Sequence, residues 1–270
     1  MSGRERIVFD RVSKEFPTAT GHIVAVKDFS LRIRDGEFIS LVGPSGCGKT
    51  TLLGMLAGFV QPTTGAVSMD DKPVGGPGPD RGVIFQDYGV FPWLTVRDNI
   101  AFGLTLKANR LPPAERDAIV ARYIELMGLR GFEDAYPKTL SGGMKQRVAL
   151  ARAYAVKSDL LLMDEPFGAL DAQTRTAMQD LLLHVLETEG KTVLFITHSV
   201  EEALYLSSRV VVITARPSRI RQVIDVPFPY PRGEELHRRP EFAELEYELR
   251  GLVMREYVDQ ERQSDISLTA

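Results

Sequence analysis

The sequence predicts an α/β fold in which a mainly parallel sheet carries helices on both faces. Four short runs are apolar at almost every position, as expected of strands that are covered on both sides. Helical patterns separate these runs, and parallel strands need such crossover connections. A glycine-rich loop follows the first run and opens a helix. The four runs are residues 38–42, 160–163, 193–196 and 210–213.

Composition and charge indicate an ordinary globular protein. The chain has 270 residues, of which 44% are hydrophobic and 26% charged, a balance that suits a domain with a substantial core. Its formal net charge is -3, and basic clusters such as residues 237–239 are short and flanked by acids. Nucleic-acid-binding domains are more often basic. We therefore expect no nucleic-acid partner.

Cysteine usage and hydropathy restrict the class further. The single cysteine, Cys47, excludes an internal disulfide and a zinc cluster built from cysteines. The first residues lack the apolar core of a signal peptide, and no uninterrupted apolar stretch approaches the roughly 20 residues that span a bilayer. We expect a cytosolic protein, and if it acts at a membrane another chain must supply the span.

The N-terminal region departs from the parallel pattern. Residues 7–9 and 31–33 have the composition of short strands with turns between them, and we expect an N-terminal antiparallel β subdomain there. With this subdomain included, the predicted α/β core comprises residues 1–86 and 158–230.

A second region, residues 87–157, has few strand signals. Ile119, Tyr123 and Met127 recur at helical spacing, and Gly128 is a plausible helix stop. We predict that this region is an α-helical subdomain inserted into the α/β core.

Residues 231–270 are predicted to form a short C-terminal helical extension. Its apolar stripe favours packing back onto the core, and the polar tail after Gln260 is expected to fray. The stripe consists of Phe242, Leu245, Leu249, Leu252 and Val253.

The glycine-rich loop predicts a nucleotide site. It fits the pattern of Gly, four residues, then Gly-Lys-Ser/Thr, and it lies between a buried strand and a helical pattern. Its glycines let backbone N–H groups surround an anion, and the helix N-terminus adds unpaired N–H groups. Lys49 can reach the β- and γ-phosphates, and the Thr50 hydroxyl can ligate magnesium. The order of strand, loop and helix argues against a glycine-rich turn that merely contains a lysine.

The residues expected to bind ATP in this loop are Gly43, Pro44, Ser45, Gly46, Cys47, Gly48, Lys49, Thr50 and Thr51. Cys47 lies where a helix N-terminus should lower its pKa. We therefore expect it to react with thiol reagents, without a catalytic role.

Two acids at the end of the second buried run predict hydrolysis. The carboxyl ends of parallel strands are where open α/β sheets build their sites. Asp164 is expected to hold magnesium, directly or through water, and Glu165 to polarise the attacking water. Many strands end in solvated charge, so the pair gains weight from the phosphate loop upstream.

A second helix start has the features of an anion site. Ser141 can cap a helix, and Gly142 and Gly143 leave backbone N–H groups uncovered. In isolation, a capped helix and nothing more is a reasonable interpretation.

Alongside the phosphate loop and the two acids, residues 140–147 closely resemble the signature of ATP-binding cassette ATPases. The resemblance covers nearly the whole chain, with the motifs in the family's order, and implies a P-loop NTPase core that hydrolyses ATP with Mg²⁺. In that family two cassettes pair head to tail, and each ATP lies between the phosphate loop of one subunit and the signature helix of the other. The resemblance thus implies a dimer, which we expect to be a homodimer. In it, Ser141, Gly142 and Gly143 would contact the ATP that is bound by the partner subunit.

Further roles follow from the resemblance alone. Gln86 resembles the glutamine that contacts magnesium and the attacking water, and His198 resembles the switch histidine near the γ-phosphate. A lone histidine after a strand is otherwise more often structural. Asp171 matches the acid of the loop that crosses the dimer interface, and Phe16 is the best candidate for stacking on adenine.

An aromatic segment after Gln86 suggests a docking surface. We expect Phe91, Trp93 and Leu94 to anchor a groove that receives a short helix from a transmembrane permease subunit. The alternative is that these side chains fill the core.

Three strings are similar to importers of the nitrate, sulfonate and taurine group, namely residues 91–100, 214–220 and 227–232. The similarity implies an ATPase at the cytoplasmic face of the inner membrane, working with permease subunits and an extracytoplasmic solute-binding protein. The cargo would be a small anion or an organosulfur or nitrogen solute.

Two alternative functional classes fit the sequence less well. Cassette ATPases that act on ribosomes or DNA usually carry two cassettes or a long coiled-coil insertion, whereas this chain has one phosphate loop, no heptad run and a negative net charge. A P-loop kinase is disfavoured by the signature string and by the second acid, Glu165.

Overall fold

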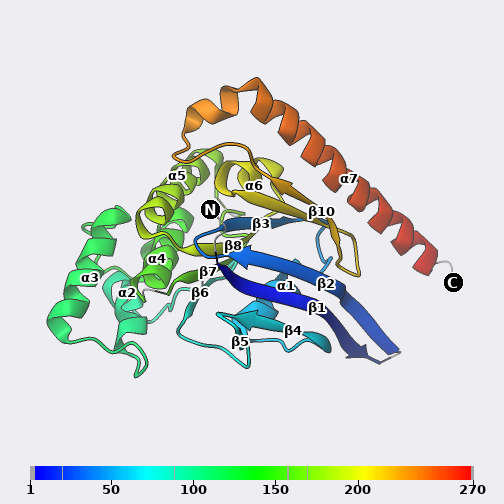
Figure 1. The fold of residues 1–270 in the computed structure, drawn as a ribbon. Coiled ribbons are helices and arrows are strands. Elements are labelled where there is room, and N and C mark those ends of the chain that lie inside the picture. The colour runs from blue at the N-terminus through cyan, green and yellow to red at the C-terminus, as the bar shows by residue number, and fades with distance from the viewer. Residues whose placement is uncertain (1–3, 20, 88, 157, 169, 269–270) are drawn as a thin grey trace. The chain divides into compact units, whose positions relative to one another are not determined.

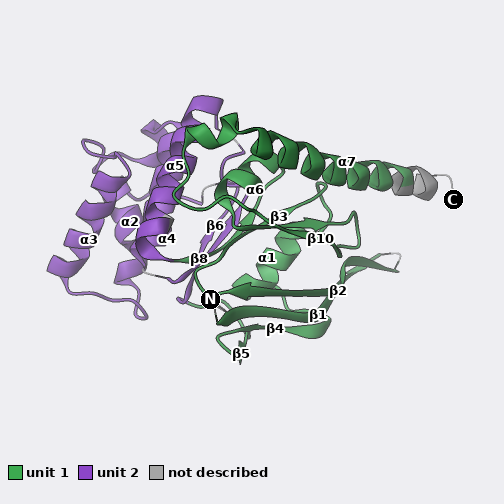
Figure 2. Cartoon of the chain, turned by 45° about the horizontal axis from the view of Figure 1, so that its top comes forward, with its two compact units in different colours: residues 1–78, 191–270 green, residues 79–190 purple. Residues whose placement is uncertain are grey.

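The computed structural model describes the whole chain except residues 1–3, 20, 88, 157, 169 and 269–270. The chain divides into two compact units (Figure 2). Unit 1 comprises residues 1–78 and 191–270, and unit 2 comprises residues 79–190.

Unit 1 contains an antiparallel sheet with strand order β2-β1-β4-β5. Its first two strands form a long hairpin (Figure 1) in which Phe9 pairs with Leu31 and Phe16 with Ile23. The N-terminal antiparallel β subdomain is therefore present, with strands much longer than the two short runs expected. The bounds are β1 Glu5–Thr18, β2 Gly21–Arg34, β4 Thr64–Met69 and β5 Lys72–Pro73.

The second sheet of unit 1 has the order β10-β9-β3-β8. Strand β3 pairs in parallel with both β8 and β9, and β10 runs antiparallel to β9. Every residue of β3 and β8 is buried, which explains their continuous apolar runs. Strand β10 was missed because most of its residues are exposed. The bounds are β3 Phe38–Val42, β8 Thr192–Ile196, β9 Arg209–Ile213 and β10 Ile220–Asp225.

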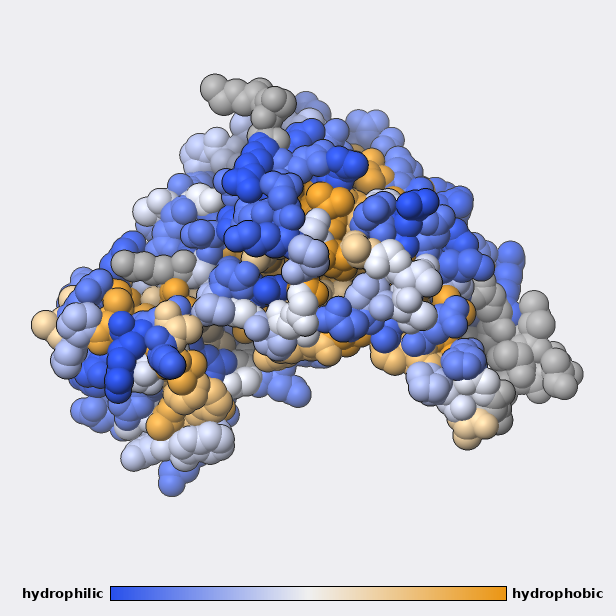
Figure 3. Space-filling model, turned by 60° about the horizontal axis from the view of Figure 1, so that its bottom comes forward, coloured by the Kyte–Doolittle hydropathy of each residue, from blue (hydrophilic) through white to orange (hydrophobic). Residues whose placement is uncertain are grey.

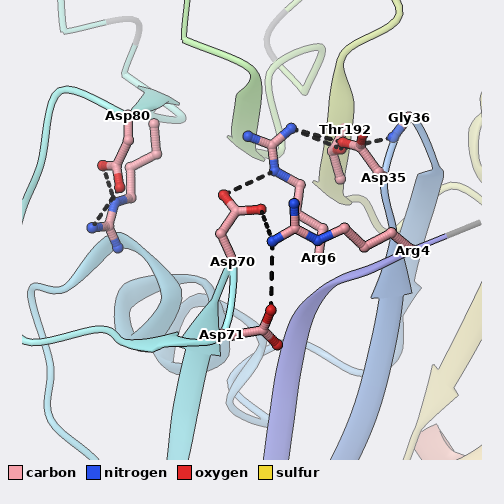
Figure 4. Close-up of polar contacts among 9 residues, drawn as sticks. Arg4, Arg6, Asp35, Gly36, Asp70, Asp71, Asp80 and Thr192 are labelled. Carbon is pink, nitrogen blue, oxygen red and sulfur yellow. Dashed lines mark hydrogen bonds and ion pairs between the residues drawn. The ribbon is translucent and has the colours of Figure 1, made fainter.

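Charged contacts join the strand ends of unit 1 (Figure 4). The buried Arg6 donates from Nη1 to Asp35 at 2.9 Å, and its Nε lies 3.7 Å from an Asp70 oxygen. The Thr192 hydroxyl oxygen, at the start of β8, accepts from the Gly36 N–H at 2.9 Å. These contacts hold the start of β8 against the turn that leads into β3.

Unit 2 contains a parallel strand pair, β6 Arg81–Ile84 and β7 Leu160–Asp164. Among the described residues between these strands, only helices and turns occur. The compact unit is wider than the predicted subdomain, residues 87–157, because it also contains the paired strands β6 and β7 and the helix that follows β7. The helices are α2 Val96–Thr105, α3 Pro113–Leu126, η1 Pro137–Thr139, α4 Gly142–Ala155 and, after β7, α5 Ala172–Glu189.

Helix α3 ends as its sequence predicts. Gly128 has a φ of 59°, and its N–H donates to the Glu125 carbonyl, a common way for a helix to stop. Tyr123 and Met127 are buried, whereas Ile119 is only half-buried. The buried stripe therefore lies slightly to one side of the predicted one.

The remaining helices of unit 1 are α1 Lys49–Ala57, α6 Val200–Leu206, η2 Glu234–Arg238 and α7 Pro240–Leu268. Helix α7 packs on α6 and β9 (Figure 1). Phe242, Leu249 and Val253 are buried, and Leu245 and Leu252 are half-buried. The backbone stays helical beyond Gln260, where the sequence suggests fraying. Across the described residues no helix is both long and apolar enough to cross a bilayer.

We predict that Leu249→Ala lowers the free energy of unfolding by about 2–5 kcal/mol, because it removes a fully buried side chain and leaves a cavity. Chemical denaturation measures this. Tyr247→Ala is the control on the same helix, because Tyr247 is 80% exposed, and it should change stability by no more than about 0.5 kcal/mol. Equal effects of the two substitutions would contradict the packing of α7.

Candidate functional site

The phosphate loop joins β3 to α1, and two of its glycines have left-handed backbone conformations. Gly46 has a φ of 70° and Gly48 a φ of 121°. A Cβ at Gly48 would lie 2.6 Å from the Ser218 hydroxyl oxygen and 2.8 Å from the Ala25 carbonyl oxygen. Only glycine fits this position.

Helix α1 starts at Lys49 without a capping side chain. Its first N–H groups are the donors that a helix leaves unpaired and that phosphate oxygens accept. The Lys49 side chain is 5% exposed and donates from Nζ to the carbonyl oxygens of Gly43 at 2.7 Å and Pro44 at 2.8 Å. The ammonium is thereby held on the loop.

The loop fits Mg-ATP. A glycine-built turn, a buried ammonium and an uncapped helix start suit a triphosphate, and Thr50 is exposed on the first turn of α1. The described residues contain no cluster of three or more His, Cys, Asp or Glu side chains that could hold a metal. Mg²⁺ does not require one, because it usually binds through one or two side chains together with the phosphates.

The predicted direction of the Cys47 pKa shift is wrong. The thiol is buried, and this burial raises its pKa above the ordinary 9.0. The Lys49 ammonium, 3.9 Å from Sγ, acts in the opposite direction, but its effect is smaller. Desolvation therefore outweighs the helix N-terminus.

His198 lies at the same edge of the sheet as the phosphate loop. In the parallel pair of β3 and β8, Leu41 is opposite Ile196, so the loop and the histidine follow neighbouring strand ends. The side chain of His198 is exposed. Next to it, the Thr197 hydroxyl donates to Glu202 at 2.6 Å and Ser199 caps α6, which fixes the local backbone.

A corresponding arrangement occurs in unit 2. In the parallel pair of β6 and β7, Ile84 is opposite Met163. Gln86 and Glu165 each follow these positions by two residues, so the two side chains leave adjacent strand ends. Asp164 is the last residue of β7 and is half-buried.

Glu165 has a strained backbone. Its φ is 45°, in the left-handed region that costs a non-glycine residue about 1–3 kcal/mol. The Gly168 N–H donates to the Glu165 carbonyl at 3.2 Å and holds this turn. Such strain is typical of functional positions, and the sequence gives no sign of it.

Ser141 caps α4, and its hydroxyl accepts from the Met144 N–H at 3.3 Å. Ser141 and Gly142 are exposed. Gly143 is buried instead, and a Cβ there would lie 2.6 Å from the Thr174 methyl carbon. The exposed end of α4 is thus formed by Ser141 and Gly142, whereas Gly143 permits close packing.

Asp171 is exposed and caps the start of α5. One carboxylate oxygen accepts from the Thr174 N–H at 2.9 Å and the other from the Thr174 hydroxyl at 2.7 Å. These hydrogen bonds lower the pKa of Asp171. Ala169, in the same predicted interface loop, lies outside the described residues.

Phe16 lies near the end of β1 in unit 1 and is 36% exposed. The Lys14 ammonium lies 5.1 Å from the centre of its ring. An exposed aromatic ring beside a cation is compatible with binding an adenine base next to phosphates.

The aromatic segment forms an exposed cluster in unit 2. Trp93 is 69% exposed and its ring centre lies 5.5 Å from that of Phe91, which in turn lies 4.5 Å from Phe102. Phe91 and Leu94 are half-buried, so the core-filling alternative fails for Trp93 and holds in part for the other two. Figure 3 shows hydrophobic patches on a mostly hydrophilic face. Tyr88, at the start of the segment, lies outside the described residues.

Asn99, which the sequence analysis missed, fixes this segment. Its buried amide nitrogen donates to the carbonyls of Phe91, Leu94 and Thr95, and its oxygen accepts from the Phe91 N–H at 2.8 Å. The exposed tryptophan is therefore carried by a rigid loop. The signal available in the sequence was a single asparagine within the apolar helical pattern of residues 96–104.

Comparisons with known proteins bear on the family and the fold of the chain. Residues 26–168 match the family model described as ABC transporter. The nitrate import ATP-binding protein NrtD of Synechococcus elongatus is 45% identical over 92% of this chain and 92% of its own length. The bicarbonate transport ATP-binding protein CmpC of the same organism is 46% identical over 90% of this chain and 37% of its own length.

Among solved structures, the ATP-binding cassette MJ0796, described as a dimer in a post-hydrolysis state bound to ADP and Pi, superimposes with a TM-score of 0.73. It is 29% identical and covers 83% of this chain and 100% of its own. The fold is thus the predicted α/β P-loop NTPase fold.

We predict that Cys47 of the folded protein reacts with a disulfide reagent at pH 8 at least about tenfold more slowly than in denaturant, because the thiolate is the reacting form and burial raises its pKa. Spectrophotometric labelling of this single cysteine measures the rate. The folded rate should increase as the pH rises past 9. Equal rates at pH 8 would show that the thiol is not buried in solution.

Proposed function

Because the chain belongs to the ABC transporter family of ATP-binding proteins, we propose that it is the subunit that powers an importer of small anions. The chain is an ATPase that uses ATP and Mg²⁺. The main support for import is the similarity of this chain, over 92% of both chains, to a protein named for nitrate import. A bicarbonate transport relative supports a small anion as cargo. Sulfonates and taurine, which are organosulfur anions or zwitterions, remain within the proposed class.

In the proposed mechanism, the uncapped N–H groups of α1 and the Lys49 ammonium bind the β- and γ-phosphates. Thr50 and Asp164 would hold Mg²⁺, which would neutralise phosphate charge. Glu165 accepts a proton from the attacking water, and Gln86, which leaves the adjacent strand end, orients that water. His198, which follows the end of β8 beside the phosphate loop, responds to the presence of the γ-phosphate.

We further propose that two copies pair head to tail. The first turn of α1 leaves its donors uncapped, and the exposed Ser141 and Gly142 present a second helix start. In a symmetric pair, each ATP would contact α1 of one subunit and α4 of the other, while Asp171 crosses the interface. The dimeric description of the structurally similar MJ0796 supports this arrangement.

The exposed aromatic cluster is proposed to bind the permease. Phe91, Trp93 and Leu94 lie on a loop that Asn99 holds rigid, and a rigid exposed tryptophan is a typical interface anchor. A short permease helix would pack on it. The chain then works as a peripheral subunit at the cytoplasmic face of the inner membrane, with a solute-binding protein on the other side.

We predict that Glu165→Gln lowers ATP turnover by about 10²–10⁴-fold and preserves ATP binding, because it removes the proton acceptor and keeps the shape of the side chain. Phosphate release and equilibrium ATP binding measure the two effects. Glu125→Gln, at an exposed position of α3, is the control and should hydrolyse ATP at the normal rate. Near-normal turnover of Glu165→Gln would remove this residue from the mechanism.

We also predict that Trp93→Ala weakens association with the permease by about tenfold or more, because interface tryptophans contribute strongly to binding. Binding to detergent-solubilised permease measures this. Phe132→Ala removes another exposed aromatic side chain of unit 2, which is 43% exposed, and should bind normally. The docking assignment fails if both variants bind as the unmodified protein does.

A further inference from the structure

Three side chains from the last part of the chain donate to three consecutive carbonyls of the phosphate loop. The Gln260 side-chain amide donates to the Ser45 carbonyl at 3.1 Å. The Arg216 guanidinium donates to the Gly46 carbonyl, at 2.7 Å from Nη2 and 3.2 Å from Nε. The Ser218 hydroxyl donates to the Cys47 carbonyl. We call Gln260, Arg216 and Ser218 the brace.

The brace orients the N–H groups of the loop. In a trans peptide the C=O and N–H bonds point in opposite directions. Holding the carbonyls of Ser45, Gly46 and Cys47 therefore fixes the direction of the N–H group that follows each of them. The Cys47 N–H itself donates to the Pro44 carbonyl at 3.4 Å, so the N–H groups left for an anion are those of Gly46 and Gly48. These N–H groups belong to the set that a phosphate loop offers to an anion.

The braced loop is also packed tightly against the turn that carries Ser218. The Ser218 N–H donates to the Ala25 carbonyl at 2.9 Å. That carbonyl oxygen and the Ser218 hydroxyl oxygen both face Gly48, where any side chain would collide with them. Ser218 is fully buried. The peptide between Cys47 and Gly48 is thus held by the Ser218 hydroxyl on one side and by close packing at the glycine.

Helix α7 anchors the turn that carries Arg216. The buried Glu256 accepts from the Ala215 N–H at 3.2 Å and lies 3.5 Å from the Arg221 guanidinium. Gln260 follows Glu256 by four residues, so the two lie on the same face of the helix. One face of α7 therefore contacts the phosphate loop directly, through Gln260, and indirectly, through the turn beside Glu256.

We propose that Arg216, Ser218 and Gln260 are positioning residues for ATP, and that through them helix α7 sets the affinity of the phosphate loop for nucleotide. The proposal rests on the assignment of residues 43–50 as the nucleotide site. The brace acts on the loop in the same way before and during the reaction. Its loss therefore raises KM and Kd for ATP and leaves kcat at saturating ATP unchanged.

The first test is ATP affinity, measured by calorimetry and by steady-state kinetics on the full chain. Arg216→Ala should raise Kd about tenfold, because it removes hydrogen bonds from a charged donor. Arg216→Lys, which keeps one donor, should fall between. Arg219→Ala is the control: it removes the same charge from the same turn, and the Arg219 backbone N–H, which bonds to Thr214, is retained. It should bind ATP normally.

Gln260→Met tests α7 itself, because it removes the donor without changing charge and with little change in shape. We expect about a threefold rise in Kd, as for a neutral hydrogen bond. Cys47, the single cysteine, supplies a second readout. Its thiol is buried within the braced loop, so Arg216→Ala and Gln260→Met should speed its labelling without nucleotide several-fold, and Arg219→Ala should not.

The proposal is overturned if Arg216→Ala and Gln260→Met, with normal thermal melting, match Arg219→Ala in both Kd and labelling rate. It is also overturned if kcat falls while KM stays constant. Should Arg216→Ala melt early, the milder Arg216→Lys and Gln260→Met decide by the same criteria. Lys49→Ala separates a failure of the nucleotide-site assignment from a failure of the brace. If Lys49→Ala binds ATP normally, the assignment of the loop as the nucleotide site fails. If Lys49→Ala weakens ATP binding and the brace variants do not, only the positioning role of the brace is rejected.

Discussion

The proposed mechanism depends on one constraint: a helix that binds phosphate must begin with N–H groups that no side chain occupies. Helix α1 meets it, because glycine precedes its first turn and no side chain caps it. Helices α4 and α6 do not meet it to the same degree, since Ser141 and Ser199 each cap one donor. We therefore propose the strong phosphate site at α1, where the glycine-rich loop also precedes the helix. In the proposed dimer, α4 adds its remaining donors and the Ser141 hydroxyl to an ATP already held by the partner.

Parallel strand pairing places the other groups that we propose to take part in the reaction. Because Leu41 pairs with Ile196, the phosphate loop and His198 leave the sheet of unit 1 at the same edge. Because Ile84 pairs with Met163, Gln86 and Glu165 do the same in unit 2. Each pair is thus positioned by backbone hydrogen bonds rather than by contacts between the side chains themselves. The loop proposed to dock on the permease follows the same principle, since the buried Asn99 fixes its backbone and leaves Trp93 exposed.

The sequence predicts what depends on local pattern. Buried strands such as β3 appear as continuous apolar runs, and the phosphate loop is defined by spacing. Strand β10 was not predicted because its residues are mostly exposed. The predicted direction of the Cys47 pKa shift was wrong because the burial of this side chain arises from the tertiary fold. The strained φ of Glu165 and the contact between Gln260 and Ser45, 215 residues apart, leave no mark in a local pattern. The likeness to importers came from motifs and not from physical derivation.

Complementation between two inactive variants tests the composite site most directly. A Lys49→Ala subunit lacks a working phosphate loop, and a Ser141→Arg subunit blocks the start of α4. In a mixed head-to-tail pair, one site carries both defects and the other carries neither. The account predicts that each variant alone is nearly inactive and that mixing them restores ATP hydrolysis as mixed pairs form. If the mixture stays as inactive as its components while mixed dimers are present, each ATP is hydrolysed within a single chain and the account is contradicted.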